Sequence, residues 1–209
     1  MKTKIDIKIF FVLIAYVLTK RIQAFGLIFI FLILHEIGHI LSGIFLGLKL
    51  KKINLSIAGF CLEFRSRSGK YKTSLIDKII IDSAGPMVNM LFLIIGFVIN
   101  NENIFYANSL IFLVNMFPIL PLDGGRIIKD VLELKFNHRT INYVMLEISK
   151  YNLIILTFIS SIIIIYVNNA FLGVFIFYLW YLYIKEKRES LVVEKLYGIM
   201  SNMKDKEYY

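Results

Sequence analysis

The sequence is poor in the residues that mark disulfide-rich, collagen-like or disordered chains. Its 209 residues include one cysteine and three prolines, and only 19% of them are charged. The lone Cys61 excludes an internal disulfide framework, and so few prolines exclude collagen-like and low-complexity chains. The basic N-terminal residues 1–8 precede an apolar run, but no small-residue cleavage site follows. We therefore expect this run to be retained rather than removed as a signal peptide.

Apolar residues, by contrast, are in excess. They make up 58% of the chain, and the mean hydropathy is +0.71, whereas soluble domains contain about 45–50% apolar residues. A soluble chain of this length could not bury so many apolar side chains. The charged residues also cluster between apolar runs, which is typical of a membrane protein with short polar loops.

Six apolar runs are predicted to be membrane spans. They cover approximately residues 9–19, 24–48, 79–99, 104–122, 153–167 and 170–184. The first is short for a hydrocarbon core about 30 Å thick, and the last two, joined by the polar turn 168–169, predict a helical hairpin. The predicted fold class is therefore an all-α polytopic membrane protein with about six transmembrane helices.

The net charge of +9 has two interpretations. Basic chains can bind nucleic acid, but here the cations lie beside apolar runs, in segments 49–78 and 126–150 and in the tail from residue 185. The turns 100–103 and 168–169 carry no lysine or arginine. The positive-inside rule then predicts a multi-pass protein of the cell membrane with both termini cytoplasmic, and no nucleic-acid partner. Lys20 and Arg21 are a minor exception on the outer side.

The segment between the second and third predicted spans has a different pattern. Residues 53–57 and 60–64 alternate apolar and polar side chains around Ala58-Gly59. This alternation predicts a short β-hairpin at the membrane surface, and a reentrant or irregular interfacial loop fits it equally well. After residue 185, mixed charged and apolar residues predict a short amphipathic surface helix.

The second predicted span contains the motif His35-Glu36-Ile37-Gly38-His39. Histidines at i and i+4 lie on one helix face, so both rings can reach one Zn²⁺ ion, which binds histidine nitrogen at about 2.0–2.1 Å. From its neighbouring position, Glu36 can reach a water molecule at the metal without being a ligand. Two histidines and a glutamate in an apolar span are costly in lipid without partners, and a metal ion supplies them.

A catalytic zinc usually takes three protein ligands. Asp123 is the best third candidate, because two prolines and two glycines in residues 118–125 break the helix and let its carboxylate turn inward. An ordinary turn aspartate fits the same local pattern. However, Asp123 and His39 are both expected to enter the membrane from the cytoplasmic side and can meet there. His138 is expected to be a solvated loop residue.

Together these motifs resemble the site-2 protease family of intramembrane zinc metalloproteases. The resemblance covers about residues 8–185. It rests on the H-E-x-x-H motif, on N-x-x-P-x-x-P-L-D-G and on G-P-x-x-N. The residues that match the last two are Asn115, Pro118, Pro121, Leu122, Asp123 and Gly124, and Gly85, Pro86 and Asn89. For Asn89 we expect a role in packing and hydrogen bonding.

The resemblance implies a function for each matched position. His35, His39 and Asp123 would bind Zn²⁺, and Glu36 would be the catalytic base of peptide-bond hydrolysis. Asn115 would hold substrate or the oxyanion near the metal, although a helix–helix hydrogen bond is its alternative role.

The order of elements is most similar to the bacterial sporulation type, which cuts a pro-sigma factor. Residues 1–185 would form the protease domain and residues 186–209 a short cytoplasmic tail, with no room for a PDZ or CBS domain. The resemblance therefore does not imply that ATP regulates this chain. The implied partners are a membrane-associated protein substrate, membrane inhibitor proteins and the lipid bilayer. An anti-sigma factor or a remnant signal peptide is the alternative substrate.

A helical substrate must be unwound before cleavage, and a strand edge could capture it by β-augmentation. We expect residues 53–64 to do this, with Ile57, Gly59 and Phe60 as substrate-binding residues. Two rival functions use the same residues differently. A transporter or channel would use the intramembrane histidines and carboxylates as an ion or proton relay, and an inactive scaffold would tolerate Glu36→Gln.

Overall fold

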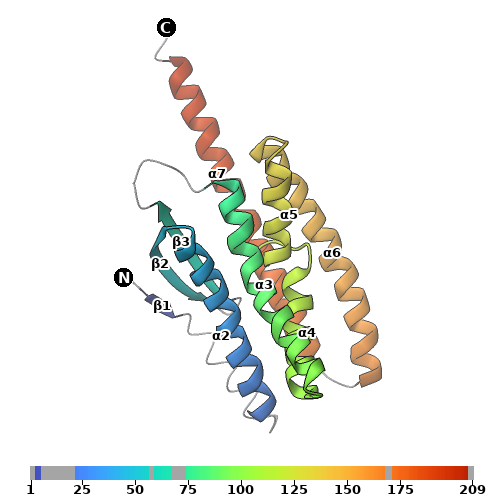
Figure 1. Cartoon of the computed structure of the whole chain (residues 1–209). Coiled ribbons are helices and arrows are strands. Elements are labelled where there is room, and N and C mark those ends of the chain that lie inside the picture. The colour runs from blue at the N-terminus through green and yellow to red at the C-terminus, as the bar shows by residue number, and fades with distance from the viewer. Residues whose placement is uncertain (1–2, 6–21, 57–58, 67–73, 168–170, 207–209) are drawn as a thin grey trace. The chain divides into compact units, whose positions relative to one another are not determined.

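The computed structural model describes residues 3–5, 22–56, 59–66, 74–167 and 171–206 (Figure 1). Its helices are α2 (Ile22–Phe45), α3 (Leu75–Val98), α4 (Glu102–Met116), α5 (Asp123–Glu133), α6 (His138–Val167) and α7 (Phe171–Lys206). Its strands are β1 (Thr3–Ile5), β2 (Leu48–Ser56) and β3 (Gly59–Ser66). The prediction of a mainly helical protein is confirmed. The first predicted span and the turn 168–169 lie outside the described residues.

Three of the described helices are long and apolar enough to cross a membrane, over Gly26–Phe45, Leu75–Val98 and His138–Ile165. Their surfaces carry large apolar side chains, among them Phe45, Phe97 and Ile165, which are 87%, 70% and 80% exposed. Apolar surface of this extent is costly in water and favourable in hydrocarbon. The helices thus have the character of a membrane protein, while the count of six spans and the orientation of the termini stay predictions.

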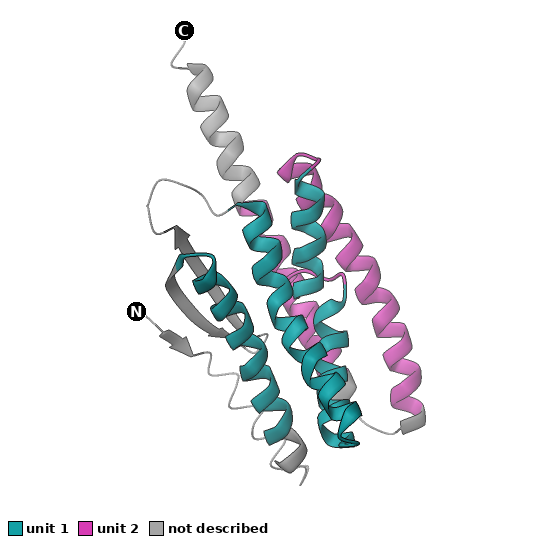
Figure 2. Cartoon of the chain, in the orientation of Figure 1, with its two compact units in different colours: residues 1–117, 122–134 teal, residues 118–121, 135–209 magenta. Residues whose placement is uncertain are grey.

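The chain divides into two compact units (Figure 2). Unit 1 consists of residues 1–117 and 122–134, and unit 2 of residues 118–121 and 135–209. In unit 1, α3 packs against α2, α4 and α5. In unit 2, α6 packs against α7, as the helical hairpin predicts. Both helices exceed their apolar runs, since α6 begins at His138 and α7 continues through residue 185 to Lys206. The predicted domain boundary therefore falls inside α7, and the tail extends that helix instead of forming one of its own.

Helix α4 is shorter than the apolar run that predicts it. The run continues to residue 122, but the helix ends at Met116. Pro118 causes this early end, because the residue before a proline is driven out of the helical conformation. Phe117 accordingly has extended angles, φ −61° and ψ 136°. The next helix begins at Asp123, so the break places the candidate ligand at a helix N-terminus.

The strands form one sheet in the order β1-β2-β3. Strands β2 and β3 are antiparallel over residues 48–56 and 59–66, with a register shift between Leu50 and Lys52. Strand β1 pairs in parallel with β2, Thr3 lying opposite Ile53. The alternating pattern therefore predicts part of a longer strand pair, and it misses β1, which is too short to show alternation. The position of the sheet at the membrane surface stays a prediction.

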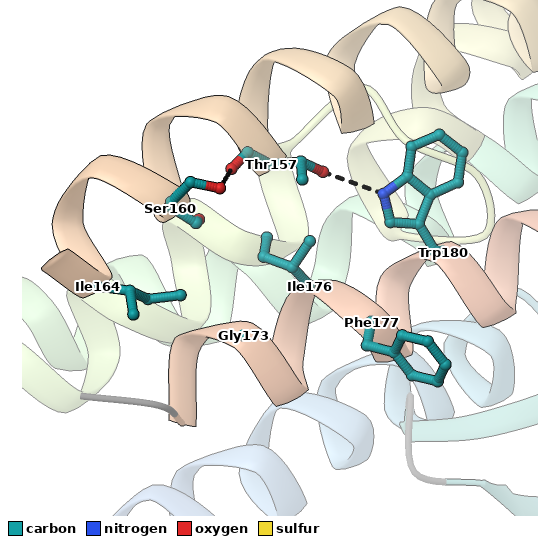
Figure 3. A pocket seen from close by; sticks show the side chains of 8 residues that line it. Thr157, Ser160, Ile164, Gly173, Ile176, Phe177 and Trp180 are labelled. Atoms are coloured by element: carbon teal, nitrogen blue, oxygen red, sulfur yellow. Dashed lines mark hydrogen bonds between the residues drawn. The ribbon is translucent and has the colours of Figure 1, made fainter. Parts of the chain in front are cut away.

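A pocket of about 230 Å³ lies between α6 and α7 (Figure 3). It is lined by Thr157, Ser160, Ser161, Ile164, Gly173, Ile176, Phe177 and Trp180. The Trp180 Nε1–H donates to the Thr157 hydroxyl at 3.0 Å, and that hydroxyl donates to the Leu153 carbonyl at 2.6 Å. Hydroxyl groups on apolar helices commonly bond to backbone carbonyls in this way.

Candidate metal centre

The two histidines of the H-E-x-x-H motif project from one face of α2. His35 and His39 are one turn apart and only 2% and 6% exposed. Their rings meet edge to face, with centroids 4.8 Å apart and an angle of 84° between the planes. Glu36, beside His35 on the same helix, is 7% exposed. The helical spacing thus brings together the groups that the sequence predicts to be neighbours.

Asp123 completes the group from α5. Its Oδ2 atom lies 3.0 Å from Nε2 of His35 and 3.3 Å from Nε2 of His39, and Asp123 is 6% exposed. Gly124 makes this approach feasible, because a Cβ atom there would lie 2.5 Å from the carbonyl carbon of Met116. The chain can therefore fold back tightly between α4 and α5 only with glycine at this position.

The hydrogen bonds of the two Nδ1 atoms determine whether the Nε2 atoms, which face Asp123, carry a hydrogen or a lone pair. Nδ1 of His39 lies 2.6 Å from the carbonyl oxygen of Ile81. A carbonyl only accepts, so this Nδ1 carries the hydrogen and Nε2 carries a lone pair. Nδ1 of His35 lies 2.5 Å from Oδ1 of Asn89, which gives His35 the same tautomer. With both rings neutral, two imidazole lone pairs and a carboxylate oxygen then converge on one point.

These three atoms have the spacing of metal ligands. The two Nε2 atoms are 3.1 Å apart, so the sides of the triangle measure 3.0, 3.1 and 3.3 Å. Tetrahedral ligands about 2.0–2.1 Å from a zinc ion lie about 3.3 Å from one another. Three converging acceptors repel unless a cation lies among them. His35, His39 and Asp123 could therefore hold a metal ion, and the donor set suits zinc.

Glycines allow α3 to approach this centre closely. A Cβ atom at Gly85 would lie 2.6 Å from Cε1 of His39 and 2.7 Å from Cε1 of His35, far inside van der Waals contact. A Cβ atom at Gly38 would lie 2.8 Å from the Val88 side chain. The sequence does not show that Gly85 makes room for both histidines.

Helix α5 carries a group of polar residues beside the candidate ligand Asp123. Asp123, Arg126 and Asp130 share one face of the helix, and both aspartates are 6% exposed. The guanidinium of Arg126 lies 4.0 Å from a carboxylate oxygen of Asp82 on α3. Burial raises the pKa of the Asp130 carboxyl above its usual range. The opposite face of α5 exposes Ile128 and Val131, 37% and 46% respectively.

The remaining candidate residues are not part of this cluster of ligand atoms. The Nδ2 group of Asn115, half-buried on α4, donates to the Ile111 carbonyl of its own helix at 3.1 Å. His138 is exposed, as expected, but it is the first residue of α6 rather than a loop residue. Gly59 and Phe60 lie on β3, and Ile57 lies outside the described residues.

Comparisons with known proteins agree with this geometry, although no protein-family model matches the chain. The chain is 26% identical over 197 residues to a zinc metalloprotease of Methanocaldococcus jannaschii. The match covers 88% of this chain and 53% of that protein, so the chain spans about half the length of this curated relative. In structure it is similar to a site-2 protease from the same organism, with a TM-score of 0.56 and 22% identity over 78% of this chain and 76% of that one. The chain therefore shares the fold of a site-2 protease.

Proposed function

We propose that this protein is an intramembrane zinc metalloprotease of the site-2 protease family, which hydrolyses a peptide bond in or near a membrane segment of a regulatory protein. The observation that carries the proposal is the convergence of three metal-ligand atoms from two helices at sites with at most 6% exposure. The fold shared with a site-2 protease and the similarity to a zinc metalloprotease support it. A transporter is not favoured, because both similar proteins are proteases.

In this proposal His35, His39 and Asp123 hold Zn²⁺. Zinc in such a site would polarise a scissile carbonyl and lower the pKa of water to about 7. Glu36 takes the proton of the attacking water and returns it to the leaving amine. Its position next to His35 and its burial suit a general base that acts in a site with little bulk water.

Asn115 is proposed to hold the substrate or the oxyanion. It lies in the last turn of α4, just before the break that leads to Asp123. Its amide group has two hydrogens, of which one bonds to the carbonyl of Ile111. The second hydrogen is the group that could donate to a carbonyl oxygen of the substrate.

The substrate is proposed to bind as an added strand. Strand β1 occupies one side of β2, so within the described residues the open edges of the sheet belong to β1 and β3. This arrangement favours β3 as the capturing edge in the predicted segment 53–64, with Gly59 and Phe60 at its start and Ile57 just before it. Proline at alternate positions of β3 would remove donors from this edge, and unchanged cleavage in such variants would refute the assignment.

The finer identity of the substrate rests on the motif resemblance. We propose a sporulation pro-sigma factor, with an anti-sigma factor or a remnant signal peptide as the alternative. A multi-pass position in the cell membrane with both termini cytoplasmic, and regulation by membrane inhibitor proteins, belong to the same proposal. The basic segments beside the apolar runs support this orientation.

Co-expression with candidate pro-sigma and anti-sigma factors tests the proposal. The native chain should release a shorter product, and the Glu36→Gln variant should abolish it while still binding zinc. A control variant, Glu102→Gln, changes an exposed carboxylate in the first turn of α4 and should cleave as the native chain does. Cleavage that persists in Glu36→Gln would remove Glu36 as the base, and a purified chain without affinity for zinc would remove the whole assignment.

A further inference from the structure

Two fully buried asparagines connect the metal centre to the backbone of α4. Asn89 on α3 and Asn108 on α4 are both 0% exposed. Asn89 contacts Nδ1 of His35 through its Oδ1 atom, and its Nδ2 group donates to Oδ1 of Asn108 at 3.1 Å. The Nδ2 group of Asn108 in turn donates to the carbonyl of Ile104 at 2.9 Å. An uninterrupted row of hydrogen bonds therefore runs from His35 to a main-chain carbonyl.

The last group in this row sets the direction of every bond before it. The carbonyl of Ile104 has no hydrogen, so Asn108 must turn its NH₂ group toward it and its Oδ1 atom toward Asn89. Asn89 must then turn its own NH₂ group toward Asn108 and its oxygen toward His35. Nδ1 of His35 is thereby required to be a donor, and its Nε2 atom keeps the lone pair.

The two histidines reach the same tautomer by different routes. His39 bonds directly to the carbonyl of Ile81, whose polarity is fixed. His35 bonds to a side-chain amide, and an amide group can turn over and present its NH₂ group instead. Asn89 alone would therefore leave the tautomer of His35 undetermined. Asn108 removes this ambiguity, because its NH₂ group must face the Ile104 carbonyl. Its Oδ1 atom then faces Asn89 and can only accept from the Asn89 NH₂ group.

We propose that Asn108 is a positioning residue of the metal centre, which acts through Asn89 to hold His35 with its Nε2 lone pair directed at the ion. The inference rests on the zinc site of the proposed function. Removing partners of ligating histidines typically weakens metal affinity about 10- to 100-fold. Asn89→Leu should weaken zinc affinity by a factor in this range, and Asn108→Leu should weaken it about 10-fold.

The test measures zinc affinity of the full chain in detergent, by competition with a chromophoric chelator. Because Asn108 acts only through Asn89, the double variant should bind zinc no more weakly than Asn89→Leu alone. Asn152→Leu is the matched control. Asn152 makes the same bond to a carbonyl four residues earlier, at 2.9 Å from Ile148, but lies on α6, which holds no candidate ligand. Its loss should leave zinc affinity unchanged.

Asn108→Asp separates polarity from packing. A protonated aspartic acid can donate to Ile104 and accept from Asn89, so this variant should retain near-native affinity where Asn108→Leu loses it.

A second readout needs no metal, namely the ¹⁵N shifts of the zinc-free protein labelled at its three histidines. His35 should carry its hydrogen at Nδ1 in the native chain. In Asn108→Leu it should be a mixture of the Nδ1–H and Nε2–H tautomers. Three results would overturn the role of Asn108 alone. They are native zinc affinity in folded Asn108→Leu, a single His35 tautomer in that variant, and additive losses of zinc affinity in the double variant. A native chain that binds no zinc would overturn the proposed function as well.

Discussion

The carboxylate of Asp123 lies 3.0 Å from Nε2 of His35, although 88 residues separate the two in sequence. The contact depends on helix α4, which ends early at Met116 because of Pro118, and on Gly124, which allows the chain to fold back. Neither His35 nor Asp123 has access to much water. A buried carboxylate beside two imidazole lone pairs is stable only with a cation or protons among them.

Asp123→Asn tests whether this group binds metal. The amide is similar in size but lacks the negative charge, so zinc binding should be largely lost. The thermal unfolding midpoint of the native chain should rise with added zinc. At zinc concentrations 100 times the dissociation constant, the free energy of unfolding should increase by about 2.7 kcal/mol. The midpoint of Asp123→Asn should not respond to zinc. An equal response in the two proteins would show that Asp123 is not a ligand.

Gly85→Ala tests the close approach of α3 to the histidines. The added methyl group would overlap both rings, so we expect a loss of about 1–3 kcal/mol in the free energy of unfolding, as for other overpacked sites, together with weaker zinc binding. Gly26→Ala is the control, because among the described residues no atom beyond its chain neighbours and the nearby backbone of α2 lies within 4 Å of the site of its Cβ atom. Alanine there should stabilise α2 by up to about 1 kcal/mol. Equal effects of the two substitutions would contradict the steric argument.

Ser149→Ala tests a hydrogen bond that holds the loop before Asp123. The Ser149 hydroxyl, 0% exposed, accepts from the N–H of Leu120 at 2.9 Å and donates to the carbonyl of Met145 at 2.6 Å. Its removal leaves a buried N–H group without its partner, which costs about 1–3 kcal/mol. Denaturation in detergent should show this loss. Ser161→Ala should cost much less, since Ser161 is exposed and its hydroxyl donates to the Thr157 carbonyl of its own helix.

The sequence could predict the candidate ligands, in part because the spacing of the two histidines follows from local geometry. His35 and His39 share a helix face at i and i+4. Asp123 stands out because prolines and glycines surround it where an apolar run ends. The choice of Asp123 also depends on the distant histidines, because an ordinary turn aspartate fits the same local pattern. The structure brings all three residues together.

The supporting residues could not be predicted in the same way. Asn108 matches none of the motifs, and its bond to Asn89 arises only when α3 packs against α4. The predicted span 104–122 extends six residues beyond α4, because apolar composition continues past Met116 while Pro118 prevents a helical conformation at Phe117. Tertiary packing and backbone conformation decide these positions, and hydropathy records neither.

The pH dependence of stability tests the burial of Asp130. Its pKa is raised by burial, so above the unfolded value of about 3.9 the folded chain binds more protons than the unfolded chain. Stability should therefore fall as the pH rises from 3.9 through the raised pKa of the folded state, where the buried group becomes charged. Asp130→Asn removes this ionisation, so its thermal midpoint at pH 7 should exceed that of the native chain and its dependence on pH between 4 and 7 should be weaker. Glu102→Gln provides the baseline for loss of an exposed carboxylate. An Asp130→Asn variant whose midpoint follows the native pH profile would show that Asp130 titrates as it does in the unfolded chain.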